Sequence, residues 1–237
     1  MAAADELRSF DSCTVSDALE ACGLTGAVNG LAPVWSCGRV VGPAVTMRLR
    51  RLEPGEQPGS GPHLGARAIG ASRHGDVIVI EHQGRADSAG WGGLLSAAAL
   101  ASGVAGVVLD GAARDVDDAL ALGFPVFARS VTPVTARGRT VEAEVGGPVR
   151  IGDVTVAPGD VVVADRSGVV FVPQAMVAEV AARASALQER EARMLGSLRQ
   201  GVPAAEVLDA SYDRMLVDGP GPAVPGSTAT SAAARRE

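Results

Sequence analysis

The chain has 237 residues, of which 47% are apolar and 20% are charged, and its formal net charge is −6. This composition predicts a soluble globular protein with one main domain and excludes a disordered chain. The acidic balance disfavours a general binder of nucleic acid or of anionic membranes. All 21 basic residues are arginine, so the chain contains no lysine. Enzymes that form a lysine imine, pyridoxal-phosphate enzymes and Walker-A nucleotide hydrolases are therefore excluded.

The cysteine and histidine content narrows the possible classes further. The chain has three histidines and three cysteines, and no two cysteines form a Cys-x-x-Cys pair. This argues against a histidine-rich zinc centre, a structural zinc site and a disulfide framework. Residues 1–10 lack the basic start and the apolar run of a secretory signal, and no apolar stretch has the length of a membrane span. We therefore expect a protein of the cytoplasm.

In chain order, the first expected element is a helix over residues 14–22, capped by Thr14 or Ser16 and stopped by Gly23. The following segments are assigned from hydrophobic patterning and from turn residues. They are a strand over 39–49 interrupted at Gly42-Pro43, a polar loop over 51–62, a helix over 63–73, a strand over 76–81, a loop over 82–90, a helix over 92–102, a strand over 106–109, a helix over 115–123 and a strand over 124–127.

Strands and helices alternate in this central part, which predicts a parallel α/β layer. Gly-Asp dipeptides at 75, 152 and 159 each precede a β-branched run, so each indicates a turn that enters a strand. Residues 141–172 are typical of short β hairpins, and residues 173–200 are typical of a long helix. Residues 1–216 are predicted to form one domain. Residues 217–237 are rich in Gly, Pro, Ser and Ala and are predicted to be a disordered tail.

The strongest candidate site lies in the central layer. The run Gly90-Trp91-Gly92-Gly93-Leu94-Leu95 opens a helix, and free backbone N–H groups at a helix start suit an anion. The run from Asp110 to Asp115 follows the next strand, so both turns are expected at neighbouring carboxyl ends, where ligands usually bind. Arg114 can hold a carboxylate or carbonyl oxygen, and Asp115 can hold a hard divalent cation. The same residues, taken alone, also fit plain packing and a helix cap.

Two polar segments near this site have open roles. In the segment 82–87, His82, Arg85 or Asp87 either selects a substrate or serves as acid or base, or else the segment is a solvated loop. The loop around residues 50–63 is long enough to form a lid.

The run Gly92-Gly93-Leu94-Leu95, followed later by Arg114 and at once by Asp115, resembles the signature of the RraA-like family. That family includes the 4-hydroxy-4-methyl-2-oxoglutarate aldolases. Segments 14–19, 41–46, 75–80 and 123–127 resemble further family elements in the same order, so the resemblance covers most of the chain. It implies an α/β fold, a swivelling β/β/α domain with a central parallel layer, β hairpins and a C-terminal helix, assembled as a homotrimer or a hexamer.

The resemblance also implies a site for a small 2-oxo acid. The backbone of Gly92, Gly93, Leu94 and Leu95 would bind the substrate carboxylate, with Arg114 near the keto oxygen and Asp115 on a divalent metal, Mg²⁺ or Mn²⁺. In the terminal helix, Glu191 resembles a family glutamate that reaches the site of a neighbouring subunit. The alternative interpretation is that Glu191 lies on the solvated face of an amphipathic helix and has no role in a site.

The absence of lysine agrees with this chemistry. Cleavage of a carbon–carbon bond beside a 2-keto group develops enolate charge, which an enzyme absorbs with a lysine imine or with a divalent metal. Only the metal route is open to this chain, with Arg114 stabilising the enolate and a positioned water carrying the proton. The expected function is a metal-dependent aldolase that releases pyruvate from a 4-hydroxy-2-oxo acid, with oxaloacetate decarboxylation as a secondary activity.

Two alternatives stay open. The first is a non-catalytic regulatory protein that resembles the family's RNase E inhibitor; such members lack the acidic residue after the arginine, whereas this chain has Asp115. The second is a family member that acts on a different 2-oxo acid or on a natural-product intermediate.

Overall fold

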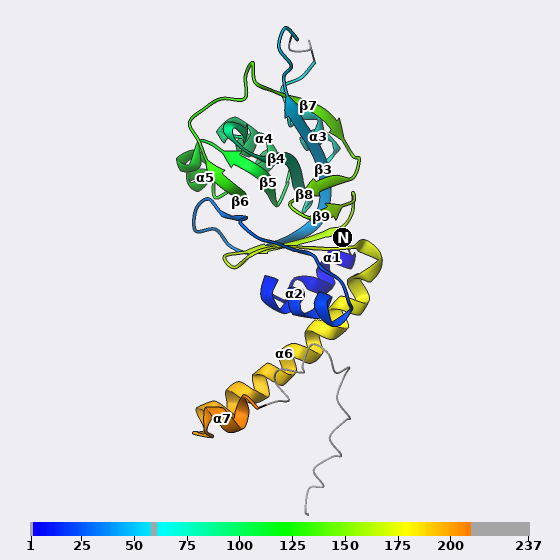
Figure 1. Cartoon of the computed structure of the whole chain (residues 1–237), viewed down its shortest axis with the longest axis vertical. Coiled ribbons are helices and arrows are strands. Elements are labelled where there is room, and N and C mark those ends of the chain that lie inside the picture. Colours follow the sequence, from blue (N-terminus) through cyan, green and yellow to red (C-terminus); the bar gives the residue numbers. More distant parts are fainter. Residues whose placement is uncertain (1, 58–60, 210–237) are drawn as a thin grey trace, which may run out of the picture.

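The protein is organised around β-strands that run through most of its length. The computed structural model describes residues 2–57 and 61–209 (Figure 1). The strands are β1 (Ala27–Val28), β2 (Ala32–Pro33), β3 (Val40–Arg51), β4 (Val77–Trp91), β5 (Gly106–Ala113), β6 (Val126–Val131), β7 (Thr140–Val145), β8 (Val149–Ile151), β9 (Val154–Val156), β10 (Val161–Asp165) and β11 (Gly168–Val172).

One nine-stranded mixed sheet has the order β1-β11-β10-β3-β4-β5-β6-β2, with β7 paired to β3, while β8 and β9 form a separate hairpin. The central strands β3, β4, β5 and β6 are parallel, and the flanking strands are antiparallel. The central strands are buried on both faces, which explains their continuous β-branched runs, such as Val77–Ile80. The predicted parallel α/β layer is confirmed.

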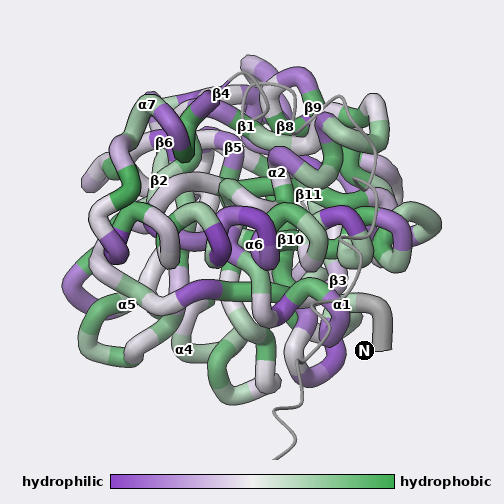
Figure 2. Tube along the Cα trace, turned by 90° about the horizontal axis from the view of Figure 1, so that it is seen from below, coloured by the Kyte–Doolittle hydropathy of each residue, from purple (hydrophilic) through white to green (hydrophobic). Residues whose placement is uncertain are grey.

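Helices cover the sheet on two sides. In Figure 1, α4 and α5 lie beside β4, β5 and β6, whereas α1, α2 and α6 lie below the layer that contains β10 and β11. Seen from below, β10 and β11 are mostly hydrophobic behind the more mixed surface of α6 (Figure 2). The helices are α1 (Ala2–Leu7), α2 (Ser12–Ala21), α3 (Ala66–Ala71), α4 (Gly93–Ala101), α5 (Val116–Leu122), α6 (Val177–Arg199) and α7 (Ala204–Val207), with a 3₁₀ turn at Gln174–Met176.

The core divides along the same layers. One buried cluster lies under α3, α4 and α5 and is centred on the large side chains of Trp91 and Phe124, whose rings stack 6.4 Å apart. A second cluster joins α1, α2 and α6 to β10 and β11. The first cluster holds the carboxyl ends of β4 and β5 rigidly in place, so it sets the position of the candidate site.

Many local predictions are confirmed. Each Gly-Asp turn leads into a strand, at Val77 of β4, Val154 of β9 and Val161 of β10. The helices expected over 92–102, 115–123 and 173–200 are present as α4, α5 and α6. The helix α1 is an addition that the sequence patterning does not indicate. Among the described residues, no helix is both long and apolar enough to cross a membrane.

The predicted loop over residues 82–90 is wrong, because β4 continues to Trp91. Its pairing with β5 shifts register between Glu81 and Arg85 and again before Trp91, so extra residues are absorbed in bulges. Gln83 and Gly84 adopt positive φ angles of 56° and 67° within the first shift. The segment therefore lacks the alternating pattern of a regular strand, and its polar composition favoured a loop.

The predicted interruption of β3 at Gly42-Pro43 is also wrong. Gly42 is required because a Cβ at this position would collide with the carbonyl oxygen of Gly75. Pro43 lies opposite Val161 of β10, and the strand continues without a break to Arg51. The dipeptide therefore marks a close approach of two backbones and not a turn.

Helix boundaries differ at two further places. Asp11, and not Thr14 or Ser16, caps α2, since its Oδ1 accepts the backbone N–H of Thr14 at 2.8 Å. The helix expected over 63–73 is reduced to α3, which begins after Gly65 at φ 83°. The tail predicted over 217–237 lies outside the described residues, and the assignment of 1–216 to one domain stays a prediction.

Candidate active site at the ends of β4 and β5

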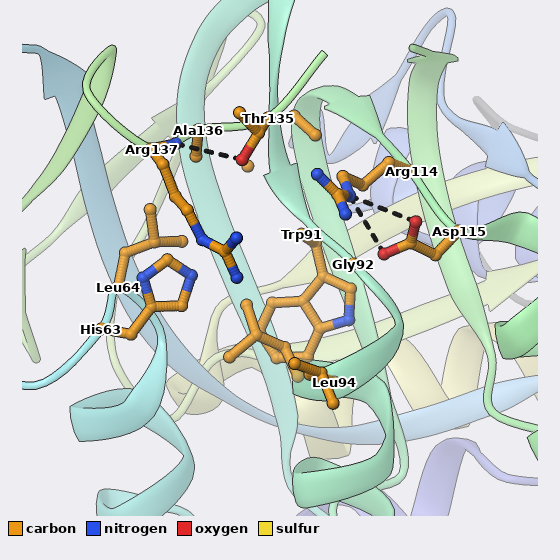
Figure 3. A pocket seen from close by; sticks show the side chains of 13 residues that line it. His63, Leu64, Trp91, Gly92, Leu94, Arg114, Asp115, Thr135, Ala136 and Arg137 are labelled. Carbon is orange, nitrogen blue, oxygen red and sulfur yellow. Dashed lines mark hydrogen bonds and ion pairs between the residues drawn. The ribbon is translucent and has the colours of Figure 1, made fainter. Parts of the chain in front are cut away.

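A pocket of about 100 Å³ opens at the carboxyl ends of β4 and β5 (Figure 3). The two segments predicted from the sequence both contribute to it. Because β4 and β5 are parallel neighbours, the turns that follow them meet at one edge of the sheet. The predicted residues that line the pocket are Gly92, Leu94, Leu95, Arg114 and Asp115, and Gly93 lies directly behind them.

Arg114 and Asp115 form an ion pair at the mouth of this pocket. Nε of Arg114 donates to Oδ1 and Oδ2 of Asp115 at 3.2 and 3.0 Å, and the backbone N–H of Gly93 donates to Oδ2 at 3.0 Å. The carboxylate thus ties the start of α5 to the start of α4. Each side chain of the ion pair is about one third exposed, at 33% and 32%, so the pair remains open to a ligand.

The backbone of Asp115 has the left-handed conformation, with φ 57° and ψ 48°. Aspartate adopts this region at lower cost than most residues, and such a conformation persists only where the surroundings hold it. Partial burial raises the pKa of Asp115, but the hydrogen bonds from Gly93 and Arg114 outweigh it and lower the pKa below its ordinary value. The carboxylate is therefore fully ionised at neutral pH.

Two glycines permit this close arrangement. A Cβ at Gly92 would lie 2.8 Å from Oδ2 of Asp115, and a Cβ at Gly93 would collide with the carboxylate of Asp118. Any larger residue at either position would displace one of these carboxylates. The glycines are thus needed for close packing between the starts of α4 and α5.

The start of α4 offers backbone donors to the pocket. The first N–H bond into the helix is that of Ser96, which donates to the carbonyl of Gly92 at 3.0 Å, so the N–H groups of Leu94 and Leu95 have no partner within the helix. Gly93 differs from the expectation that its N–H would bind substrate, since this group already donates to Asp115. The helix dipole adds positive potential at the same end.

The floor and the opposite wall come from residues that the sequence did not single out as site residues. Trp91 forms the floor, is 1% exposed, and donates its indole N–H to Ser96 Oγ at 3.0 Å. His63 and Arg137 lie on the other side of the pocket from Arg114, and Thr135 lies between Arg137 and Arg114 (Figure 3). These residues come from two connecting segments, one before α3 and one between β6 and β7, which carry no motif of their own.

The structure does not bring His82, Arg85 or Asp87 to this pocket. His82 is fully buried, its Nε2 lies 2.9 Å from the carbonyl oxygen of Ser88, and burial lowers its pKa. Asp87 pairs with Arg85 at 2.9 Å and with Arg51 at 2.6 Å. These contacts lie within the bulged part of β4 or join it to Arg51, away from the pocket, so neither substrate selection nor acid–base catalysis in this pocket falls to these three residues.

Glu191 lies on the exposed surface of α6 and does not line the pocket of its own chain. In Figure 1, α6 runs away from the sheet on the side opposite to α4 and α5. Any contact of Glu191 with this kind of site would involve another copy of the chain, so its assigned role stays a prediction.

The donor set of the pocket suits a hard divalent cation. Among residues 2–57 and 61–209, no group of three His, Cys, Asp or Glu side chains is placed to hold a metal. Among the described residues that line the pocket, Asp115 is the only carboxylate, none is a cysteine, and the one histidine lies on the opposite side, which does not fit zinc. Mg²⁺ is commonly bound through one or two carboxylates and keeps several water or substrate ligands. Asp115 therefore fits Mg²⁺ or Mn²⁺, whose binding would compete with the contact from Arg114.

Comparison with known proteins supports the expected family. The chain is 32% identical over 196 residues to protein DlpA of Legionella pneumophila, an alignment that covers 83% of this chain and 31% of DlpA. The chain thus spans about a third of that relative. It is 34% identical over 190 residues to a protein of Halalkalibacterium halodurans named "Putative 4-hydroxy-4-methyl-2-oxoglutarate aldolase", covering 79% of this chain and 85% of the relative.

A solved structure shows the same fold. The crystal structure of Streptomyces coelicolor RraAS2, described as an unusual member of the RNase ES inhibitor RraA protein family, superposes with a TM-score of 0.71 at 26% identity. The superposition covers 82% of this chain and 95% of that structure. The α/β fold inferred from the resemblance is confirmed. The family model for RraA-like proteins, described as aldolase/RraA, matches residues 12–171, and the chain therefore belongs to the RraA-like family.

Proposed function

We propose that this protein is a divalent-metal-dependent aldolase that cleaves a 4-hydroxy-2-oxo acid and releases pyruvate. The observation that carries the proposal is the ionised Asp115 held beside Arg114 at the N-terminus of α4, within one pocket. The name of the Halalkalibacterium relative, a putative aldolase of the same substrate class, supports it. Because the chain has no lysine, an imine mechanism is not available.

The chain's own residues would orient the 2-oxo acid. The free N–H groups of Leu94 and Leu95, with the extended backbone of Gly92, suit the substrate carboxylate. Arg114 contacts Asp115 through Nε, so its two terminal nitrogens can donate to the keto oxygen. As the carbon–carbon bond breaks, negative charge grows on that oxygen, and a guanidinium already in place stabilises it without reorganisation.

Asp115 would hold the divalent cation, Mg²⁺ or Mn²⁺. The cation, when bound, supplies Lewis-acid polarisation of the keto oxygen. Gly93 fixes the orientation of the Asp115 carboxylate, because its N–H donates to Oδ2 at 3.0 Å. Trp91, which forms the floor of the pocket, and Leu95 beside it limit the access of bulk water to the substrate from the core side.

Decarboxylation of oxaloacetate is proposed as a secondary activity. The reaction needs the same stabilisation of negative charge on a keto oxygen beside a carboxylate, and hence the same groups. A relative that accepts a different 2-oxo acid or a natural-product intermediate would use the same residues, so the choice between substrates depends on the wall opposite Arg114.

We also propose assembly as a homotrimer or hexamer, with Glu191 of one chain reaching the pocket of a neighbour. The outer part of α6 extends beyond the sheet (Figure 1). Leu195 on that part is 51% exposed. This leucine and the length of the projecting helix make α6 available for a contact with another chain. Light scattering of the purified protein, together with mixing of Glu191→Gln and Asp115→Ala chains, tests this: restored activity in mixed oligomers supports the shared site, and a monomer refutes it.

The central experiment measures pyruvate release from 4-hydroxy-2-oxo acids with added Mg²⁺ or Mn²⁺ and with excess chelator. Asp115→Ala is expected to abolish most of the activity. Asp153→Ala is the matched control, since the Asp153 side chain is fully exposed and lies on the β8–β9 hairpin. Activity that survives in chelator, or in Asp115→Ala, contradicts the proposed metal-dependent lyase.

A regulatory function is the second candidate, because the Streptomyces structure belongs to a family described as RNase ES inhibitors. This function predicts binding to RNase E that persists in Arg114→Ala, since an inhibitor does not need the pocket. A direct binding measurement that detects no complex between the purified proteins refutes it.

A further inference from the structure

We propose that Arg137 and His63 form a second anion subsite, on the wall opposite Arg114, that holds the distal carboxylate of a diacid substrate. The inference rests on the proposed lyase function and adds to it the residues that select the acceptor half of the substrate. It assigns a role to two residues that no sequence motif in the chain marks.

Arg137 is presented by a loop with a fixed base. The loop spans residues 132–139, between β6 and β7. The N–H of Ala89 in β4 donates to the carbonyl of Val134 at 2.9 Å, and the N–H of Arg137 donates to Thr135 Oγ1 at 3.2 Å. The backbone that carries Arg137 is therefore tied to the end of β4, where the pocket opens.

His63 is fixed in a comparable way. Its carbonyl accepts the N–H of Ala66 at 3.1 Å, and the next residue, Leu64, is buried in the core. The N–H of Gly65 donates to the carboxylate of Glu142 at 2.8 Å. These contacts fix the backbone at His63 and just after it, so the exposed imidazole is carried at the pocket wall by an anchored segment.

The pocket carries more positive than negative side-chain charge, because Arg137 has no carboxylate partner among the described residues. Arg114 is paired with Asp115, which leaves no net charge on that side. Within the described part of the chain, Arg137 makes no ion pair with a carboxylate, although it lines the pocket. In a protein with a net charge of −6, this leaves an arginine without a paired carboxylate facing the cavity, which favours an anionic ligand there.

Figure 3 shows how the two walls are related. The Arg137 side chain extends from its loop toward the space between His63 and Trp91, while Arg114 points in from the other side. The guanidinium remains open to solvent and at the same time lines the pocket, so a ligand that enters can reach it. Its fork and the imidazole N–H can both donate to one carboxylate.

The part of the pocket surface that lies between Arg114 and Arg137 is largely apolar. Leu64, Trp91 and Ala136 line the pocket and are buried, so they offer carbon atoms without unpaired polar groups. A substrate that fits has polar groups at both ends and carbon atoms between them. A 4-hydroxy-2-oxo diacid has this pattern, with its 2-oxo acid end at Arg114 and α4 and its second carboxylate at Arg137 and His63.

The test compares two substrates that differ only at the distal end. These are 4-hydroxy-2-oxopentanedioate and 4-hydroxy-2-oxopentanoate, in which a methyl group replaces the second carboxylate. Loss of one charge-assisted contact in Arg137→Gln is expected to lower kcat/KM for the diacid by about tenfold to a hundredfold. The monoacid is expected to change by less than about twofold, since it makes no contact there. His63→Asn is expected to show a smaller effect of the same kind.

Arg139→Gln is the matched control, because Arg139 is, like Arg137, an exposed arginine of the same loop but does not line the pocket. Its side chain makes a 3.5 Å hydrogen bond to the carbonyl oxygen of Arg137, so this variant also controls for a disturbance of the loop backbone. It should leave kcat/KM for both substrates near the wild-type values. An Arg137→Gln variant that lowers kcat/KM for both substrates equally, or for neither, overturns the subsite.

A binding measurement separates this inference from the proposed reaction. Calorimetry with 2-oxoglutarate and with pyruvate, in wild type, Arg137→Gln and Arg139→Gln, requires no turnover. If no 4-hydroxy-2-oxo acid is cleaved, the aldolase proposal fails. Weaker binding of 2-oxoglutarate in Arg137→Gln alone then still supports the subsite, and equal binding in all three proteins overturns it.

Discussion

Replacing Asp115 by asparagine separates the charge of this residue from its structural role. Asparagine keeps a side-chain oxygen that can accept the Gly93 N–H, which now donates at 3.0 Å. It also tolerates the left-handed backbone at φ 57°, as aspartate does. Alanine provides neither, so Asp115→Asn and Asp115→Ala differ in structure but share the loss of the carboxylate.

The expected magnitudes follow from these contacts. The ion pair with Arg114 is about one third exposed, so its loss in Asp115→Asn lowers the free energy of unfolding by about 1 kcal/mol or less. Asp115→Ala also loses the hydrogen bond from Gly93, which costs about 1 kcal/mol. In addition, alanine lacks the polar side chain that helps aspartate or asparagine adopt the left-handed conformation, which costs about 1 kcal/mol more. We therefore expect a total loss of about 2–3 kcal/mol for alanine.

The two variants should differ in the free energy of unfolding but lose catalytic activity to a similar extent. Both variants lack the carboxylate that orients Arg114 and would hold the cation, so kcat/KM is expected to fall by about 10²–10³ in each. Urea unfolding at neutral pH and pyruvate release over a titration of Mg²⁺ measure the two quantities. If Asp115→Asn keeps near wild-type kcat/KM and the same dependence on Mg²⁺, the role of the charge is refuted. If the two variants lose equal stability, the backbone reasoning is refuted.

Three further changes test other contacts. Gly92→Ala places a Cβ 2.8 Å from Oδ2 of Asp115, so kcat/KM should fall about tenfold or more while urea unfolding changes little; unchanged kinetics would contradict the packing. Asp165→Ala removes hydrogen bonds from Ser12 N and Oγ at 2.8 and 2.7 Å and should cost about 2–3 kcal/mol. Burial raises the pKa of Asp165, but these bonds lower it overall, so this stability is full above about pH 4 and lost as the pH falls through the folded-state pKa; a loss near neutral pH in the wild-type-minus-variant difference would refute it. Trp91→Phe keeps a buried ring but loses the 3.0 Å hydrogen bond from the indole N–H, so thermal unfolding should show a stability loss of about 1 kcal/mol. A loss above about 3 kcal/mol would contradict this and show that the size of the ring matters more than its hydrogen bond.

Local chemistry made much of the fold predictable. Gly-Asp turns followed by β-branched runs mark the starts of β4, β9 and β10, because turn residues and strand propensity act over a few neighbours. Alternation of strands and helices between residues 76 and 127 was enough to indicate the parallel layer. The continuation of β4 through residues 82–90 was not predictable in this way. It depends on shifted pairing with β5 and on the bulge at Gln83, which is a relation between distant segments.

The candidate site also has features that the sequence predicts and features that only the tertiary structure shows. The sequence by itself excluded lysine chemistry and placed Arg114 and Asp115 next to a glycine-rich helix start, since each of these features is contained in composition or in a short run. Only the tertiary structure showed that Gly93 uses its N–H to hold Asp115. It alone brought His63 and Arg137 to the opposite wall of the pocket. Their segments are far from the motif along the chain, and pairing across the sheet and packing against the core decide where they meet it.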